Sequence, residues 1–167
     1  FHGTPTSKIA KEAGVANGTL FHYFSTKELL ISELYLSVKK HLSSYLSHNL
    51  DKCKTTREKV KHVCINWIKW GVENSDKFTF FQQFSNSPCI NSISREEGAK
   101  NFKFAFEIIE EGINNGSLVD IDKYLIISLL FGSTNGLISF ALEFPDKFND
   151  DHLKTGFKMI WRAIANI

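Results

Sequence analysis

The stretch TPTSKIAKEAGVANGTLFHYFSTKELL, residues 4–30, predicts two short helices that meet at a tight turn and lead into a third. Gly14 can adopt the positive φ that this corner requires, and Ala10 is small enough to let the two helices approach closely. Their inward faces are expected at Ile9, Ala10, Ala13, Val15, Leu20 and Phe24. Two short helices packed around such a turn form a helix-turn-helix.

The second of these helices has features that a purely structural helix does not need. Asn17-Gly18-Thr19 gives its first turn a poor helix propensity, and Gly18 leaves the backbone open to close approach. Hydrogen-bonding groups that the core does not need follow at Asn17, Thr19, His22 and Tyr23. A recognition helix presents such groups to the DNA major groove. Lys27 opens the next helix, where its charge suits a phosphate.

These residues resemble the helix-turn-helix signature of TetR/AcrR-type bacterial transcription regulators. The match is almost continuous over Thr4, Ile9-Ala10, Ala13-Gly14-Val15, Gly18-Thr19-Leu20, Tyr23-Phe24 and Lys27-Glu28. The resemblance implies a DNA-binding domain, a long linking helix and a divergent C-terminal bundle. It also implies that a small molecule bound in the bundle weakens DNA binding by changing the separation of two DNA-binding modules.

The chain departs from the family pattern in ways that bear on DNA binding. The family has a supporting first helix, and only FHG precedes residue 4, so the DNA-binding domain is expected to be incomplete. Phe21 stands where the family usually has a phosphate-contacting Tyr, and Asn17 stands where it often has Lys. DNA contacts are still predicted at Thr4, Thr6, Ser7, Asn17, Gly18, Thr19, Phe21, His22, Tyr23 and Lys27.

The composition fits a folded protein that works in a reducing compartment. The 167 residues are 43% hydrophobic and 23% charged, with a net charge of +2. Cys53, Cys64 and Cys89 match no metal-ligand spacing or disulfide framework, which favours a reducing compartment. The resemblance implies that this compartment is the bacterial cytoplasm. No apolar run is expected to approach membrane-span length. Because the only methionine is Met159, a segment upstream of Phe1 is expected.

Apolar residues recur at helical spacing nearly throughout, so the predicted fold is all-α. The expected helices span residues 5–12, 16–23, 26–48, 56–74, 77–85, 95–115, 121–143 and 150–166. Capping boxes are expected at Ser25 with Glu28, Thr55 with Glu58 and Ser94 with Glu97, and Thr4 is expected to cap the first helix. The predicted helix-turn-helix domain covers 1–48, and a C-terminal ligand-binding and dimerisation bundle covers 49–167.

Fifteen Phe and three Trp give the predicted bundle a large aromatic content. The simplest explanation of aromatic stripes on facing helices is that they form the hydrophobic core. Aromatic side chains also line ligand pockets well, so a cavity is the alternative. A ligand cavity is predicted at Trp67, Trp70, Phe81, Phe84, Phe102, Phe106 and Asn135. The absence of a charge cluster among these residues favours an apolar or planar effector.

The last two predicted helices carry more apolar residues than one packed stripe can bury. Burial within the monomer explains part of this surface, and a two-fold four-helix interface would cover the rest. Members of the resembled family dimerise through these last two helices. A homodimer interface is therefore predicted at Leu129, Gly136, Leu137, Phe140, Leu153, Phe157, Ile160, Trp161 and Ile164.

The sequence thus predicts a ligand-responsive regulator that binds double-stranded DNA. Because repression is the commoner mode in the resembled family, we expect a repressor that binds an inverted-repeat operator. No cofactor, metal or catalytic set is expected, because no Cys stands at a telling distance from a His and no Glu-x-x-His pair occurs. The alternative is a helical-bundle ligand-binding or adaptor protein with degenerate DNA binding, favoured by Phe21 and Asn17. DNA affinity at low and moderate salt separates the two.

Overall fold

The computed structural model describes residues 3–85, 87, 90 and 92–166, with the backbone alone for 92–95. In this part of the chain the helices are α1 (Thr6–Glu12), α2 (Asn17–Tyr23), α3 (Lys27–Ser47), α4 (Thr56–Glu73), α5 (Ser75–Phe84), α6 (Ser92–Lys100), α7 (Lys103–Asn114), α8 (Lys123–Glu143) and α9 (Asp150–Ile164), with a 3-10 turn at Leu50–Lys52. The same residues form one isolated β-bridge, between Leu118 and Ala165, and no strand. The all-α prediction is confirmed.

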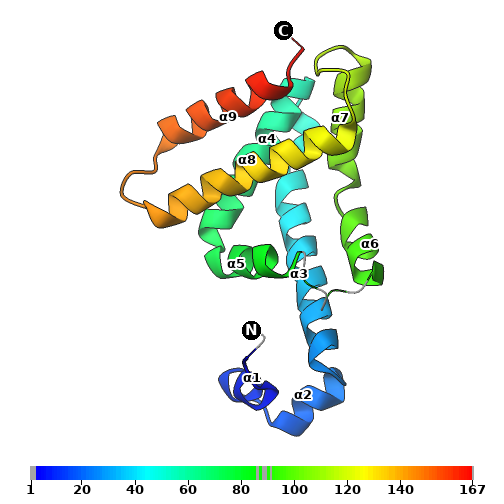
Figure 1. Ribbon diagram of the computed structural model, residues 1–167, viewed down its shortest axis with the longest axis vertical. Coiled ribbons are helices and arrows are strands. Elements are labelled where there is room, and N and C mark those ends of the chain that lie inside the picture. The colour runs from blue at the N-terminus through cyan, green and yellow to red at the C-terminus, as the bar shows by residue number, and fades with distance from the viewer. Residues whose placement is uncertain (1–2, 86, 88–89, 91, 167) are drawn as a thin grey trace.

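The molecule is elongated, with the helix-turn-helix at one end and a helical bundle at the other (Figure 1). Helix α3 starts beside α2 and continues into the bundle, where it packs on α4, α5 and α6. The side chains that bury this helix recur at helical spacing: Ile31, Tyr35, Val38, Leu42 and Leu46. One continuous helix therefore links the two ends of the molecule.

The predicted single helix over 95–115 is wrong, because the chain divides there into α6 and α7. The break lies at Asn101 and Phe102, where the φ and ψ of Phe102 are −107° and 15°. The Ser43 hydroxyl on α3 donates to the Asn101 carbonyl oxygen at 2.5 Å, which satisfies an acceptor that the helix would otherwise use. The break also brings the Phe102 ring within 6.4 Å of the Trp67 ring, measured between centroids.

The helix caps follow the sequence in some places and depart from it in others. Thr55 and Glu58 form the predicted reciprocal capping box at the start of α4. Backbone N–H groups of Lys54 and Thr55 donate to the Glu58 carboxylate and lower its pKa. The box predicted at Ser25 is wrong: α3 starts one residue later, and the Thr26 side chain accepts from the Leu29 amide.

At the first helix, Pro5 rather than Thr4 precedes the first helical residue, and no side chain caps it. The capping box predicted at Ser94 is wrong, because α6 already starts at Ser92 and Ser94 is its third residue. Asp122 and Asn149 cap α8 and α9. Gly14 has the positive φ predicted for its turn, and Gly116, after α7, also has a positive φ.

Helix α8 is long and apolar enough, by length and composition, to cross a membrane. The expectation that no run approaches that length was wrong, because the Ser, Thr, Asn and Gly residues that interrupt this helix carry no charge. Core helices meet the same criterion, so it is weak evidence for a membrane. The inner face of α8 is buried in the bundle, at Ile126, Thr134, Asn135, Ile138 and Ala141.

Loss of the α4 capping box tests how far this helix holds the bundle together. Thr55→Ala removes the hydroxyl that accepts from the Glu58 amide, and we expect it to lower the free energy of unfolding by about 1 kcal/mol. Thr79→Ala is the matched control, since that exposed hydroxyl only bonds the Ser75 carbonyl one turn back in α5. Urea unfolding measures both; equal effects of the two changes would contradict the role assigned to the cap.

Candidate DNA-binding helix and ligand cavity

Helices α1 and α2 pack on each other around Gly14, whose φ is 69°. Ala10 and Leu20 are buried at their contact, and the Val15 amide donates to the Ala10 carbonyl at 3.0 Å. Ala13 and Val15, predicted to face inward, are exposed. The packing of α1 on α2 covers only the small contact at Ala10 and Leu20, so that part of the prediction was wrong.

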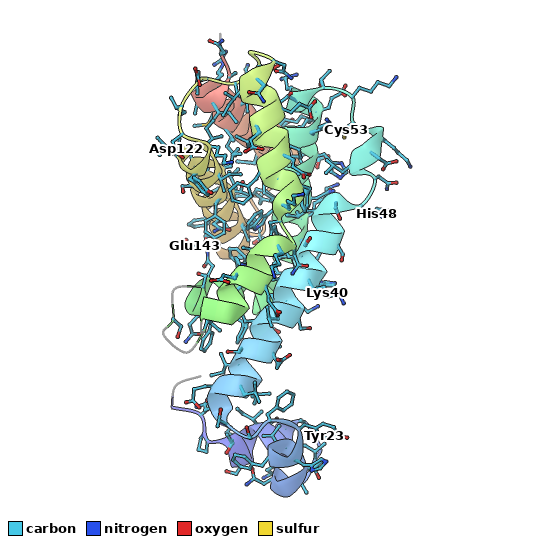
Figure 2. The ribbon with its side chains drawn as sticks, turned by 90° about the vertical axis from the view of Figure 1, so that its right-hand side faces the viewer. Tyr23, Lys40, His48, Cys53, Asp122 and Glu143 are labelled. Carbon is cyan, nitrogen blue, oxygen red and sulfur yellow. The ribbon has the colours of Figure 1, made fainter. Side chains whose placement is uncertain are left out.

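Helix α2 exposes most of its polar side chains at the end of the molecule farthest from the bundle, where Tyr23 lies (Figure 2). Asn17, Gly18, Thr19 and His22 are exposed, as is Ser7 on α1. Phe21 is 42% exposed and Tyr23 is 72% exposed, although both carry large rings. A helix with this surface can lie in a major groove without unpacking its own core.

Lys27 is half-buried, and its ammonium donates to the Thr4 carbonyl at 2.8 Å. This bond ties the segment before α1 to the first turn of α3. Thr4 and Thr6 are also half-buried.

A cavity of about 250 Å³ lies in the bundle, between the linking helix and α4 to α8. Its wall is formed by Lys39, Val60, Val63, Cys64, Trp67, Phe81, Ala99, Phe102, Ala105, Phe106, Ile108, Ile109, Ile127, Leu130, Phe131 and Thr134. Nearly all of these side chains are apolar, and Lys39 is the charged one. The cavity is slightly smaller than the roughly 300–1,000 Å³ of typical ligand pockets.

The structure brings Trp67, Phe81, Phe102 and Phe106 together in this wall, as the sequence predicted. The other predicted ligand residues lie elsewhere. Trp70 is fully buried and its indole N–H donates to His41 Nδ1 at 2.9 Å, while Phe84 stacks on Phe80. Asn135 is buried on α8 without contributing to the wall.

Several wall residues were not predicted. Phe131 and Thr134 follow Ile127 at helical spacing, so the α8 stripe carried a signal for them. Lys39 had none, because a lysine on a long helix is ordinarily solvated. Its place depends on the break between α6 and α7, which the sequence pattern did not indicate.

Cys64 lies in the wall as an inert thiol. Burial raises its pKa to about 12, and the hydrogen bond to Thr134 only partly offsets this. The group therefore stays protonated near neutral pH and is a poor nucleophile. The described residues contain no cluster of His, Cys, Asp and Glu that could hold a metal ion.

The outer face of α8 combines exposed apolar side chains with bare glycines. Leu125 and Leu129 are 51% and 45% exposed, and nothing lies within 4 Å of where a Cβ on Gly132 or Gly136 would be. Phe140 is half-buried at the end of the same face. Of the residues predicted for the interface on α9, Phe157, Ile160 and Ile164 are buried within the subunit.

The remaining predicted interface residues are Leu137, Leu153 and Trp161, which are half-buried. Leu137 packs close to Gly156 of α9, where a Cβ would lie 2.6 Å from Leu137 Cδ1. The Trp161 ring lies 6.3 Å from that of Phe157, and the Arg57 guanidinium lies 5.8 Å from its centroid. These residues join α8, α9 and α4 in one subunit, so the open surface is mainly that of α8.

Comparison with known proteins finds matches along nearly the whole chain. A fatty acid metabolism regulator protein of Bacillus subtilis is 33% identical over 142 residues, which is 83% of this chain and 73% of that protein. A TetR-family transcription regulator from Shewanella sp. PV-4 is 28% identical in its crystal structure, with a TM-score of 0.89 over 98% of this chain and 88% of that one.

The crystal structure of FadR from Bacillus subtilis in complex with stearoyl-CoA has the same fold, with 22% identity and a TM-score of 0.73 over 99% of this chain and 90% of that one. The family model for bacterial regulatory proteins of the tetR family matches residues 1–34, and the model for the tetracyclin repressor-like C-terminal domain matches residues 35–166. The chain belongs to the TetR family of bacterial transcriptional regulators.

Proposed function

We propose that this ligand-responsive DNA-binding regulator is a cytoplasmic repressor that leaves its operator when an effector fills the bundle cavity. The observation that carries the proposal is the position of α3. The same helix begins at the DNA-binding helices and provides Lys39 to the cavity wall. A ligand that prefers one placement of α3 therefore shifts the orientation of α2 as well.

The effector proposed for this cavity is a compound with an apolar chain, of the acyl type. One part of the wall is aliphatic, with Val60, Ile108, Ile109, Ile127 and Leu130. Burying a methylene group there contributes about 0.8 kcal/mol, so affinity should rise with chain length until the cavity is full. The related Bacillus subtilis protein named as a fatty acid metabolism regulator supports this class of compound.

DNA binding is proposed to use the predicted contact residues on α1 and α2 and Lys27. Two copies of the chain would each bind one half of an inverted repeat. Asn17 and Thr19 open α2, and helix-turn-helix proteins read bases with the first residues of the recognition helix. Phe21 and Asn17 lack the phosphate contacts that Tyr and Lys would supply, so binding should rely more on base contacts and shape. A protein that binds a ligand but has no affinity for DNA would instead favour the alternative function, a ligand-binding or adaptor protein.

The second copy is proposed to pack on the outer face of α8. Leu125, Leu129, Gly132 and Gly136 lie on one stripe of this helix, and the glycines let another helix approach closely. A two-fold axis on this face pairs the stripe with itself. It would also cover the apolar surface that gives α8 its membrane-like composition.

Substitutions on α2 and α3 test the DNA-binding proposal. We expect Lys27→Ala to weaken binding to every duplex, and Asn17→Ala or Thr19→Ala to change sequence preference by roughly 1–3 kcal/mol per lost bidentate base contact. Lys52→Ala is the control, since it removes an exposed charge in the turn after α3. Fluorescence anisotropy on a selected operator and on a scrambled duplex measures each; uniform losses for all three changes would contradict the recognition-helix assignment.

A charge placed on the outer face of α8 tests the dimer. Leu129→Arg should convert a dimer into a folded monomer, because an unpaired buried charge costs several kcal/mol at an interface and little on a solvated surface. Val72→Arg, at a side chain of α4 that is 39% exposed, is the matched control. Light scattering gives the mass and circular dichroism the helix content. A parent protein that is monomeric at micromolar concentration would remove both the dimer and the inverted repeat.

A further inference from the structure

We propose that the indole N–H of Trp67 donates a hydrogen bond to an uncharged carbonyl oxygen of the effector, whose apolar chain lies in the rest of the cavity. The inference rests on the proposed ligand-binding function and makes it more specific. It names the chemical group by which the cavity distinguishes a carbonyl compound from a hydrocarbon of the same shape, and the side chain that makes this distinction.

The cavity has two chemically different ends. The rings of Trp67, Phe81, Phe102 and Phe131 form the aromatic end. Aliphatic side chains on α7 and α8, next to Val60 on α4, form the other end. Val60 and Trp67 are seven residues apart on one helix, so the two ends lie about 10 Å apart along α4. An apolar chain that fills the aliphatic end can therefore place its first polar group near Trp67.

The indole ring of Trp67 packs among three other rings of the wall. The centroids of the Phe131, Phe102 and Phe81 rings lie 5.2, 6.4 and 6.5 Å from that of the Trp67 ring. The indole nitrogen is buried, and no group in the described part of the chain accepts a hydrogen bond from it. The aromatic end of the cavity therefore contains one unpaired donor.

A buried indole N–H without a partner is unusual in a folded protein. Nearly all buried donors are paired, because an unpaired one loses its hydrogen bonds to water and gains nothing in return. Trp70, on the same helix, follows this rule, since its indole N–H donates to His41 Nδ1 at 2.9 Å. The chain thus provides an acceptor for one indole of α4 but not for the indole in the cavity wall. The partner of Trp67 is supplied by the compound that the cavity binds.

The chemistry of the wall determines which acceptor fits. An indole nitrogen is a donor only, so its partner must be an acceptor. The Cys64 thiol and the Thr134 hydroxyl are already hydrogen-bonded to each other, and the Lys39 ammonium lies over two aromatic rings. A carboxylate has about four acceptor sites and would leave most of them unpaired beside Trp67. A carbonyl oxygen is satisfied by one donor, so the wall favours an uncharged carbonyl compound.

Two of the rings around the donor have room to move. Phe102 and Phe131 are half-buried, whereas Phe81 is 4% exposed. Both half-buried rings line the cavity, so either can turn towards open space rather than into packed core. A carbonyl oxygen reaches the buried Trp67 nitrogen when one of these rings turns aside. The new hydrogen bond then stabilises the turned position.

Three probes of similar length test the carbonyl contact: 2-nonanone, 2-methyl-1-nonene and nonanoate. The alkene has the shape of the ketone, with a CH2 group in place of the oxygen. Nuclear magnetic resonance spectra of the full chain, labelled with nitrogen-15 at tryptophan, resolve the indole N–H groups, and the signal missing in Trp67→Phe belongs to Trp67. We expect 2-nonanone to move this proton signal downfield, as a new hydrogen bond does, and 2-methyl-1-nonene to bind without that shift.

Trp67→Phe keeps an aromatic ring in the wall and removes the donor. It should weaken 2-nonanone by roughly five- to hundredfold more than 2-methyl-1-nonene, because only the ketone is left with an unpaired buried oxygen. Phe106→Leu is the matched control, since it also makes a half-buried wall side chain smaller but removes no donor, and it should weaken both probes equally. The rise in melting temperature with probe concentration gives each affinity.

The remaining outcomes contradict separate parts of this account. The same response of the Trp67 signal to ketone and alkene, or equal losses for the two probes in Trp67→Phe, would overturn the role of Trp67 while ligand binding stands. Tighter binding of nonanoate than of 2-nonanone would reject the uncharged carbonyl. If no probe binds and none releases operator DNA in an anisotropy assay, the proposed function and the inference both fail. Should Trp67→Phe not fold, triple-resonance assignment of the parent identifies the signal, and the parent spectra decide.

Discussion

The unbroken helix α3 is the constraint on which the other properties of this molecule depend. Its buried stripe, from Ile31 to Leu46, anchors it in the bundle, while its first turn holds the Thr4 carbonyl through Lys27. Because a helix of this length resists bending unless a specific residue disrupts it, motion at one end is transmitted to the other. A movement of α3 in the bundle would therefore also move its first turn, to which the Thr4 carbonyl before α1 is bonded.

The packing of α6 against α3 connects the cavity to this helix. The break at Asn101 and Phe102 lets Phe102 enter the wall, and Gly98 gives the Lys39 stem its place. A ligand at the aromatic end would therefore contact the junction between α6 and α7 and the linking helix α3 at once. Packed cores have few alternative arrangements, so small changes in such a contact can select between two placements of a helix.

Much of the fold could be predicted from the sequence because its signals are local. Gly14 with the small Ala10 specified the turn, and Thr55 with Glu58 specified the start of α4. The break inside 95–115 could not be predicted, because it depends on the Ser43 hydroxyl, which lies far away in sequence on α3. Val15 was placed inside from its apolar character alone, although burial depends on which neighbours pack against it.

For the candidate cavity, periodicity identified the aromatic wall but not the residues whose role depends on tertiary packing. Trp70 and Trp67 lie on the same apolar stripe of α4, so both were predicted to line the cavity. In the structure the Trp70 indole N–H donates to His41 on α3 instead. Lys39 lies in an apolar wall only because Gly98 and Phe102 are placed beside it by the same break. Residues on α9 were assigned to a partner because their count was high, whereas the subunit itself buries Phe157 and Ile160.

The central claim is that a ligand in the cavity moves the DNA-binding helices through α3. The most direct measurement is the distance between two spin labels at Lys11→Cys, an exposed position on α1 outside the predicted DNA contacts, in the dimer, by pulsed electron resonance, in a chain with Cys53 and Cys89 changed to Ser. Cys64 is buried with a raised pKa and resists labelling. The account predicts that an apolar-chain ligand shifts the distance distribution at concentrations that release operator DNA. Release of DNA with an unchanged distribution would contradict it.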